Sequence, residues 1–100
     1  MRELFGLHGT LIAKQGKRDA LLAILVDASK GAPRMPGCRL YLVSLVPDDP
    51  DAVAVTEVWD DEASHDASLT LESVRETIGR ARPLIAGGGT STTFHPVAGV

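Results

Sequence analysis

An α+β fold is predicted by three features of this 100-residue sequence. Apolar runs at 38–46 and 52–59 are separated only by the acidic segment PDDPD, which is typical of a β-hairpin. Residues 17–29 repeat apolar side chains at the spacing of one helix face. A glycine triplet at 87–89 separates a second helical region from a final threonine-rich run.

The first half of the chain predicts a strand, a helix and a second strand. Residues 4–13 form an apolar run that contains two glycines. The helix over 17–29 is followed by Gly31 and by prolines that end it. Residues 38–46 show almost no polar alternation, so we expect both faces of this strand to be covered. The buried face of the helix consists of Leu21, Ile24, Leu25 and Ala28.

The second half begins with a strand over 52–59 and a split helical segment. Asp60 or Asp61 is suited to cap the first, short helix. Thr70 offers a new cap for a second helix that runs to about Arg82. Four residues are expected to point inward from this second helix: Leu71, Val74, Ile78 and Ala81.

The last strand is predicted over 90–95, after Pro83 has ended the helix. The complete order is β-α-β-β-α-β, with the second helical segment split in two, which indicates a ferredoxin-like fold. We expect residues 1–96 to form a single domain and residues 97–100 to form a loose tail.

The predicted strands are apolar on both sides, whereas helices would cover only one face of a four-stranded sheet. A second copy of the chain packed on the other face would bury the surplus apolar surface, so the sequence predicts a homodimer. The alternative is that a helix or the short, glycine-rich tail covers this face in a monomer.

The composition excludes several classes of protein. The net charge is -3, and no basic stripe with interleaved aromatic residues is present, which argues against a nucleic-acid surface. Cys38 is the only cysteine, so we expect a reducing compartment and a cytoplasmic location. No apolar stretch is long enough to cross a bilayer, so no membrane partner is expected.

Three segments together resemble a known family. The segments are GTLIAKQGKRDALL, PGCRLYLVS and the strand end EVW followed by DDEASHDASL. Over about Leu4 to Phe94 they resemble the antibiotic biosynthesis monooxygenase (ABM) domain. This resemblance implies a dimeric α/β barrel. Some members oxidise quinols or polyphenolic aromatic substrates with O2 and without metal or flavin, others degrade haem, and some have no established activity.

Only some of the family's functional residues are matched in this sequence. Trp59 matches the strand-end tryptophan of the family, while Ser68 and Ser73 stand where many members have histidines. His65 lies nearby instead, in the predicted helix. The haem-degrading members rely on an asparagine, and this sequence contains none. The resemblance therefore favours oxygenation of an aromatic ligand over haem breakdown.

Trp59 and His65 are the predicted catalytic residues. An indole gives a flat apolar wall for an aromatic ring, and an imidazole can accept a proton. His65 precedes Leu69 by four residues, so the two share a helix face that should point inward. Alternatively, Trp59 only fills the core, and His65 is a surface residue bonded to Asp61 or Asp66.

Further candidates for substrate binding, with Trp59, are His8, Tyr41 and Arg75. His8 lies in the first strand and could reach the site, Tyr41 could orient a phenolic hydroxyl, and Arg75 could hold an anion. Their structural alternatives are a core or interface histidine, a packing tyrosine and a helix-surface arginine. Glu57 shares a strand face with Trp59 and is expected to pair with Arg39.

No cofactor or metal is predicted, because the three histidines lie far apart and show no ligand spacing. Taken together, the residues and the resemblance predict a cofactor-independent monooxygenase that acts on a quinol-like or polyphenolic aromatic substrate with O2. The alternative is a non-catalytic dimer that binds a small aromatic ligand.

Overall fold

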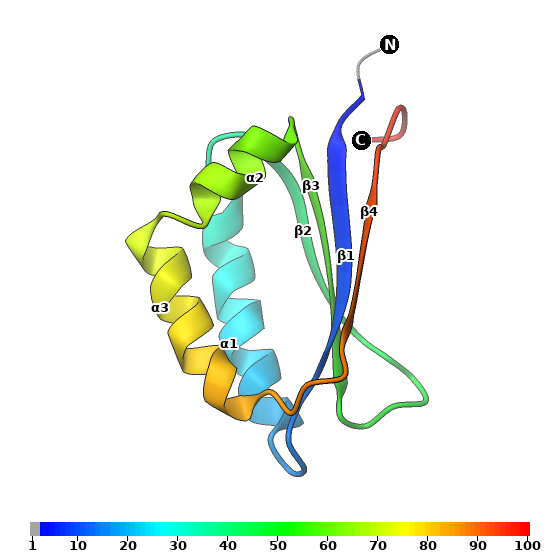
Figure 1. Ribbon diagram of the computed structural model, residues 1–100, viewed down its shortest axis with the longest axis vertical. Coiled ribbons are helices and arrows are strands. Elements are labelled where there is room, and N and C mark those ends of the chain that lie inside the picture. Colours follow the sequence, from blue (N-terminus) through cyan, green and yellow to red (C-terminus); the bar gives the residue numbers. More distant parts are fainter. Residues whose placement is uncertain (1–2) are drawn as a thin grey trace.

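The computed structural model describes residues 3–100 and shows a four-stranded antiparallel sheet with three helices on one face (Figure 1). The strand order is β2-β3-β1-β4, which places β3 and β1 at the centre. This arrangement confirms the predicted ferredoxin-like α+β fold with a split second helical segment. The elements are β1 (Phe5–Ile12), α1 (Arg18–Gly31), β2 (Cys38–Leu45), β3 (Ala52–Trp59), α2 (Glu62–Ser68), α3 (Glu72–Ala81) and β4 (Thr90–Phe94), with short 3-10 turns at Ala32–Arg34 and Arg82–Leu84.

The start of α3 differs from the prediction. Thr70 is not its cap, because the Thr70 hydroxyl donates backward to the Ala67 carbonyl at 2.7 Å. Leu71 occupies the capping position without a side-chain hydrogen bond. Thr70 therefore closes the end of α2 instead of opening α3.

The core lies between α1 and the central strands. Leu21 and Leu25 of α1 pack with Val53 and Val55 of β3, and Ala81 of α3 completes the cluster. Antiparallel partners share a face of the sheet, so the register places alternate residues of all four strands on the helix side. The predicted buried face of α1 thus supplies Leu21 and Leu25 to the core, with Ile24 partly buried against it.

The predicted inward face of α3 is only partly buried. Ala81 is buried and Val74 is half-buried, but Ile78 and Leu71 are each 38% exposed. The reason is that α3 packs mainly against α1 and makes few contacts with the strands. Space therefore remains between this helix and the sheet.

The start of α2 is fixed by three local contacts. The Asp61 carboxylate accepts a hydrogen bond from the Ser64 backbone N–H at 2.8 Å, which confirms Asp61 as the cap. The Gly37 carbonyl accepts from the Asp60 N–H at 2.8 Å. Gly37 has a φ of +81°, and a Cβ there would lie 2.6 Å from the Ser64 hydroxyl. These contacts hold the first turn of α2 against the entry to β2.

The other face of the sheet carries no helix. Leu40, Val58 and Phe94 lie in one row across it, and Leu42 is 49% exposed in the next row. Residues 97–100 belong to no helix or strand. Among residues 3–100, no helix combines the length and apolar character needed to cross a membrane.

Candidate functional site

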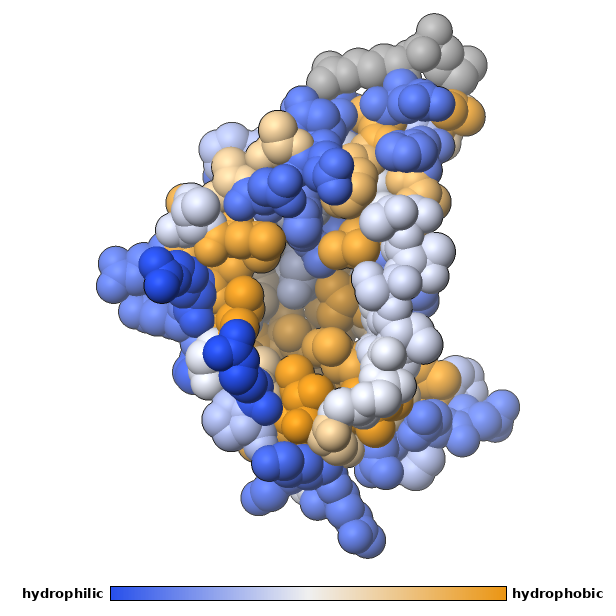
Figure 2. Space-filling model, in the orientation of Figure 1, coloured by the Kyte–Doolittle hydropathy of each residue, from blue (hydrophilic) through white to orange (hydrophobic). Residues whose placement is uncertain are grey.

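A cavity of about 910 Å³ lies on the helix side of the sheet, bounded by β1, β2, β3 and all three helices. Figure 2 shows it as a hollow between the helices and the strand edge, with hydrophobic residues inside it and on its helix side and a paler rim on the strand side. It results from the position of α3, which stands off the sheet. Its lining includes Leu11, Leu25, Tyr41, Glu57, Trp59, His65, Val74, Ile78 and Ile85.

Trp59 and His65 lie together at this cavity. The ring centroids are 5.9 Å apart with an interplanar angle of 75°, an edge-to-face arrangement. His65 also contacts Phe5, with ring centroids 5.5 Å apart. Phe5 and Trp59 are paired across β1 and β3, so the imidazole contacts two neighbouring aromatic rings on the helix side of the sheet.

The two residues differ in accessibility. Trp59 is only 1% exposed, whereas the His65 side chain is 15% exposed. The indole is therefore packed into the core, and the imidazole is the more accessible of the two rings. His65 lines the cavity and is not a surface residue, although it makes the bond to Asp66 that the alternative interpretation expected.

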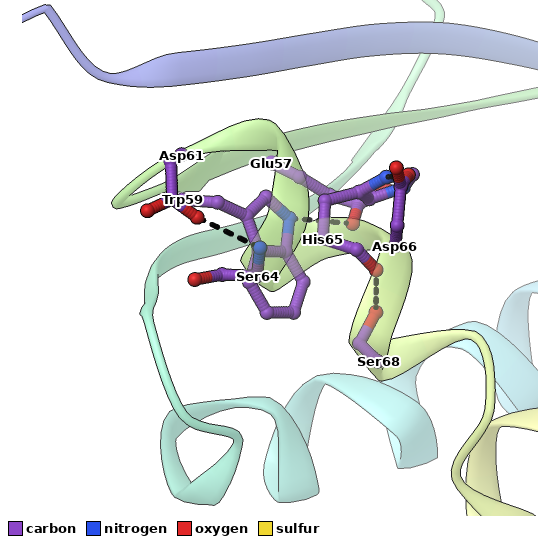
Figure 3. A network of polar contacts seen from close by, with 7 residues as sticks. All are labelled: Glu57, Trp59, Asp61, Ser64, His65, Asp66 and Ser68. Atoms are coloured by element: carbon purple, nitrogen blue, oxygen red, sulfur yellow. Dashed lines mark hydrogen bonds and ion pairs between the residues drawn. The ribbon is translucent and has the colours of Figure 1, made fainter.

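The ring nitrogens of His65 have different environments. Nδ1 lies 3.1 Å from the Asp66 carboxylate, which only accepts, so Nδ1 carries the proton (Figure 3). In the neutral imidazole Nε2 then holds a free lone pair. Below the ring, the Ser68 hydroxyl donates to the His65 carbonyl at 2.6 Å and steadies this turn of α2. The result is an oriented proton acceptor at an apolar cavity.

Glu57 has a different partner from the one expected. Its carboxylate accepts a hydrogen bond from Trp59 Nε1 at 3.1 Å (Figure 3). Arg39 pairs instead with Asp60 at 2.6 Å, outside the cavity, because a β-bulge between Cys38 and Leu40 changes the register there. The expectation of a Glu57–Arg39 pair is therefore wrong, and Glu57 is a cavity residue.

Tyr41 lies directly across from Glu57 in the sheet and also lines the cavity. Burial, and then the nearby Glu57 carboxylate and Cys38 thiol, raise the pKa of Tyr41 from 10.0 to about 12. Burial and Glu57 also raise the pKa of the Cys38 thiol, against a smaller opposing effect of the Leu40 carbonyl. Tyr41 is thus a protonated phenol over the physiological pH range, and Cys38 a poor nucleophile.

Two predicted binding residues are not brought to the cavity. His8 points to the opposite face of the sheet, where Nδ1 lies 2.8 Å from the Thr56 hydroxyl. Arg75 is exposed on α3 and does not line the cavity, although its neighbour Glu76 does.

Sequence reasoning missed a polar stripe on α3 at the cavity. Ser73 and Thr77 are one helical turn apart, and the Thr77 hydroxyl donates to the Ser73 carbonyl at 3.0 Å. Arg80, one residue short of the next turn, lies 4.0 Å from Asp27 of α1 at the same cavity. A polar repeat at helical spacing was the available signal. Among residues 3–100, no group of three or more His, Cys, Asp and Glu side chains is placed to hold a metal ion.

Fold and site together define a small α+β protein with an aromatic-walled cavity beneath its helices. Residues 4–80 match the family model described as Antibiotic biosynthesis monooxygenase, and the chain belongs to this family. A comparison with curated protein sequences gives no match.

Solved structures give the same picture. A protein from Chloroflexus aurantiacus J-10-fl that carries the same family name is 49% identical, covers 97% of this chain and 96% of its own, and has a TM-score of 0.86. A Nitrosomonas europaea protein, also carrying that name, has a TM-score of 0.90 at 12% identity, with 97% and 93% covered. A Shewanella oneidensis protein has a TM-score of 0.84 at 22% identity, with 96% and 93% covered. The last two likenesses concern the fold alone.

Proposed function

We propose that the protein is a cofactor-independent monooxygenase that oxidises a quinol-like or polyphenolic aromatic substrate with O2. The observation that carries this proposal is that His65 lines the cavity while its Nδ1 is bonded to Asp66, which leaves Nε2 as the basic ring nitrogen. Membership of the family supports the reaction class. Haem breakdown is not proposed, because the sequence lacks the asparagine of the haem-degrading members.

The proposed reaction starts with removal of a hydroxyl proton from the substrate by His65 Nε2. The resulting anion passes one electron to O2, and the aryloxyl radical and superoxide combine to form a C–O bond. Cleavage of the O–O bond then leaves one oxygen atom as a carbonyl on the ring, and the other oxygen leaves as water with two substrate hydrogens. The chain supplies the base, the apolar surroundings and the orientation of the ring.

The other cavity residues support this reaction. Trp59 contacts the imidazole edge-to-face and donates a hydrogen bond to Glu57, while the protonated phenol of Tyr41 is available to orient a substrate hydroxyl. His8 and Arg75 have no part in it, since neither lines the cavity.

Oxygen uptake with a panel of hydroquinones tests the proposal. His65→Ala should lower the rate by about 100-fold, the usual contribution of a positioned general base. His95→Ala is the matched control, because His95 is an exposed histidine bonded to the Leu4 carbonyl outside the cavity. Labelled O2 should place one oxygen atom in the product. Unchanged uptake by both His65→Ala and Trp59→Phe would remove these residues from the mechanism.

Oxygen uptake also distinguishes this enzyme from the alternative, a non-catalytic binding protein. Aromatic ligands would then raise the melting temperature without any oxygen uptake. The apolar cavity serves either activity, so turnover is the measurement that decides.

We further propose that the working form is a homodimer built on the open face of the sheet, giving the dimeric α/β barrel that the family resemblance implies. Leu40 and Leu42 of β2 and Phe94 of β4 are exposed on this face. A second copy would bury these side chains and cover the His8–Thr56 pair between them. The proposed location is the cytoplasm, where the lone Cys38 stays reduced.

A further inference from the structure

Glu57 is the only acidic residue within the four strands of the described chain. Its neighbours across the sheet are Tyr41 on β2 and Leu7 on β1. A carboxylate on such an apolar surface loses hydration and requires compensating hydrogen bonds. In the four described strands this cost arises at Glu57 alone, and Glu57 lines the cavity.

The hydrogen bonds of Glu57 are incomplete within the described chain. One carboxylate oxygen accepts from Trp59 Nε1, and no second side-chain partner is found among residues 3–100. No buried side-chain oxygen in this part of the chain lacks a partner, so the other oxygen must reach the cavity that Glu57 lines. A carboxylate only accepts hydrogen bonds, so the cavity offers an oriented, negatively charged acceptor.

We propose that Glu57 is a specificity-determining residue that accepts a hydrogen bond from a hydroxyl group of the aromatic ligand. The cavity then prefers uncharged hydroxyarenes to their methyl ethers, which lack a donor, and to aromatic carboxylates, which carry the same charge as Glu57. This inference rests on the aromatic ligand of the proposed function and requires binding alone, not turnover.

Isothermal titration calorimetry with 2-naphthol, 2-methoxynaphthalene and 2-naphthoate tests the inference on the wild-type protein. The three ligands share one ring system and differ in a single substituent. A charge-assisted hydrogen bond corresponds to roughly a tenfold to hundredfold preference for 2-naphthol over its ether. The carboxylate should bind more weakly than the naphthol.

Glu57→Gln sharpens the test, because the amide keeps an acceptor for Trp59 Nε1 and turns a donor toward the cavity. Binding of 2-naphthol should weaken by about tenfold, and binding of 2-naphthoate should strengthen. A merely structural role for Glu57 would leave the order of the ligands unchanged. Glu72→Gln is the matched control, since it removes the same charge from an exposed residue outside the cavity lining.

Equal wild-type affinities for the naphthol and its ether would overturn the inference. An unchanged ligand order in Glu57→Gln, or no binding of any of the three compounds, would overturn it as well. If the protein prefers the naphthol but consumes no oxygen with hydroquinones, the oxygenase proposal is contradicted. The proposed role of Glu57 in ligand binding is then still supported.

Discussion

Single side chains on β2 and β3 decide the chemistry of the cavity, and Tyr41 shows how. Its phenol is buried beside the Glu57 carboxylate and the Cys38 thiol, so ionisation would place a further negative charge where two acidic groups already lie. The hydroxyl therefore remains a donor to a ligand under all ordinary conditions.

The raised pKa of Tyr41 predicts how stability depends on alkaline pH. The pKa of the phenol is 10.0 in the unfolded chain and about 12 in the folded one. Its contribution to the free energy of unfolding is fully present below pH 10 and is lost as the pH rises toward 12, by up to about 2 kcal/mol. Urea unfolding followed by circular dichroism should show this decline in the wild type and a smaller one in Tyr41→Phe.

A direct titration checks the same point. Tyr41 is the only tyrosine, so the absorbance of tyrosinate reports on one residue. A midpoint close to 10.0 in the folded protein would contradict the burial of the phenol described here.

Among the elements, α2 carries His65 and depends on its cap. Asp61→Ala removes the acceptor for the Ser64 N–H and should lower the free energy of unfolding by about 1 kcal/mol. The helix would also fray at its first turn, so affinity for aromatic ligands should fall with stability. Chemical denaturation measures the first effect and calorimetry the second.

The control for this change is Asp48→Ala, which removes an exposed aspartate from the β2–β3 turn. It should change stability by less than about 0.5 kcal/mol. If the two variants lose equal stability, the capping bond of α2 contributes nothing.

The sequence predicts elements better than it predicts their partners. β3 matches its predicted bounds because a run rich in valine and alanine starts directly after the acidic turn and ends at Trp59, before Asp60 and Asp61. The partner of Glu57 could not be predicted, because the bulge in β2 turns Arg39 toward Asp60 and a bulge leaves no mark in the apolar pattern. The meeting of Trp59 and His65 followed from their places at adjoining ends of β3 and α2.

The size of the cavity was beyond prediction from periodicity. The apolar repeat in α3 indicates which side faces inward, but not how far the helix stands from the sheet. Ile78 lines the cavity and is still 38% exposed, since α3 rests on α1. Distance between layers depends on packing of whole elements, which a one-dimensional pattern does not record.

At the scale of the whole molecule, the open face of the sheet predicts the oligomeric state. Leu42→Glu places a charge on this face in both copies of the proposed homodimer. Each copy also loses the burial of one leucine, so the dimer dissociation constant should rise by about 100-fold or more. Analytical ultracentrifugation over a dilution series measures the change.

Val26→Glu is the control, because Val26 is an exposed apolar residue on α1, on the helix side of the molecule. Its dissociation constant should equal that of the wild type. A wild-type protein that is monomeric at every concentration, or a Leu42→Glu variant that dimerises normally, would contradict the proposed interface.

The glycines between α3 and β4 limit which side chains can line this part of the cavity. Gly87 borders the cavity with a φ of +98°, and Gly88 follows with a φ of +76°, so residues with side chains are strained at both positions. Gly89 lies so close to the Thr10 carbonyl that a Cβ would collide with it. Larger residues at these positions would cost stability. Relatives that bind smaller ligands should therefore have a cavity narrowed by larger side chains on α3.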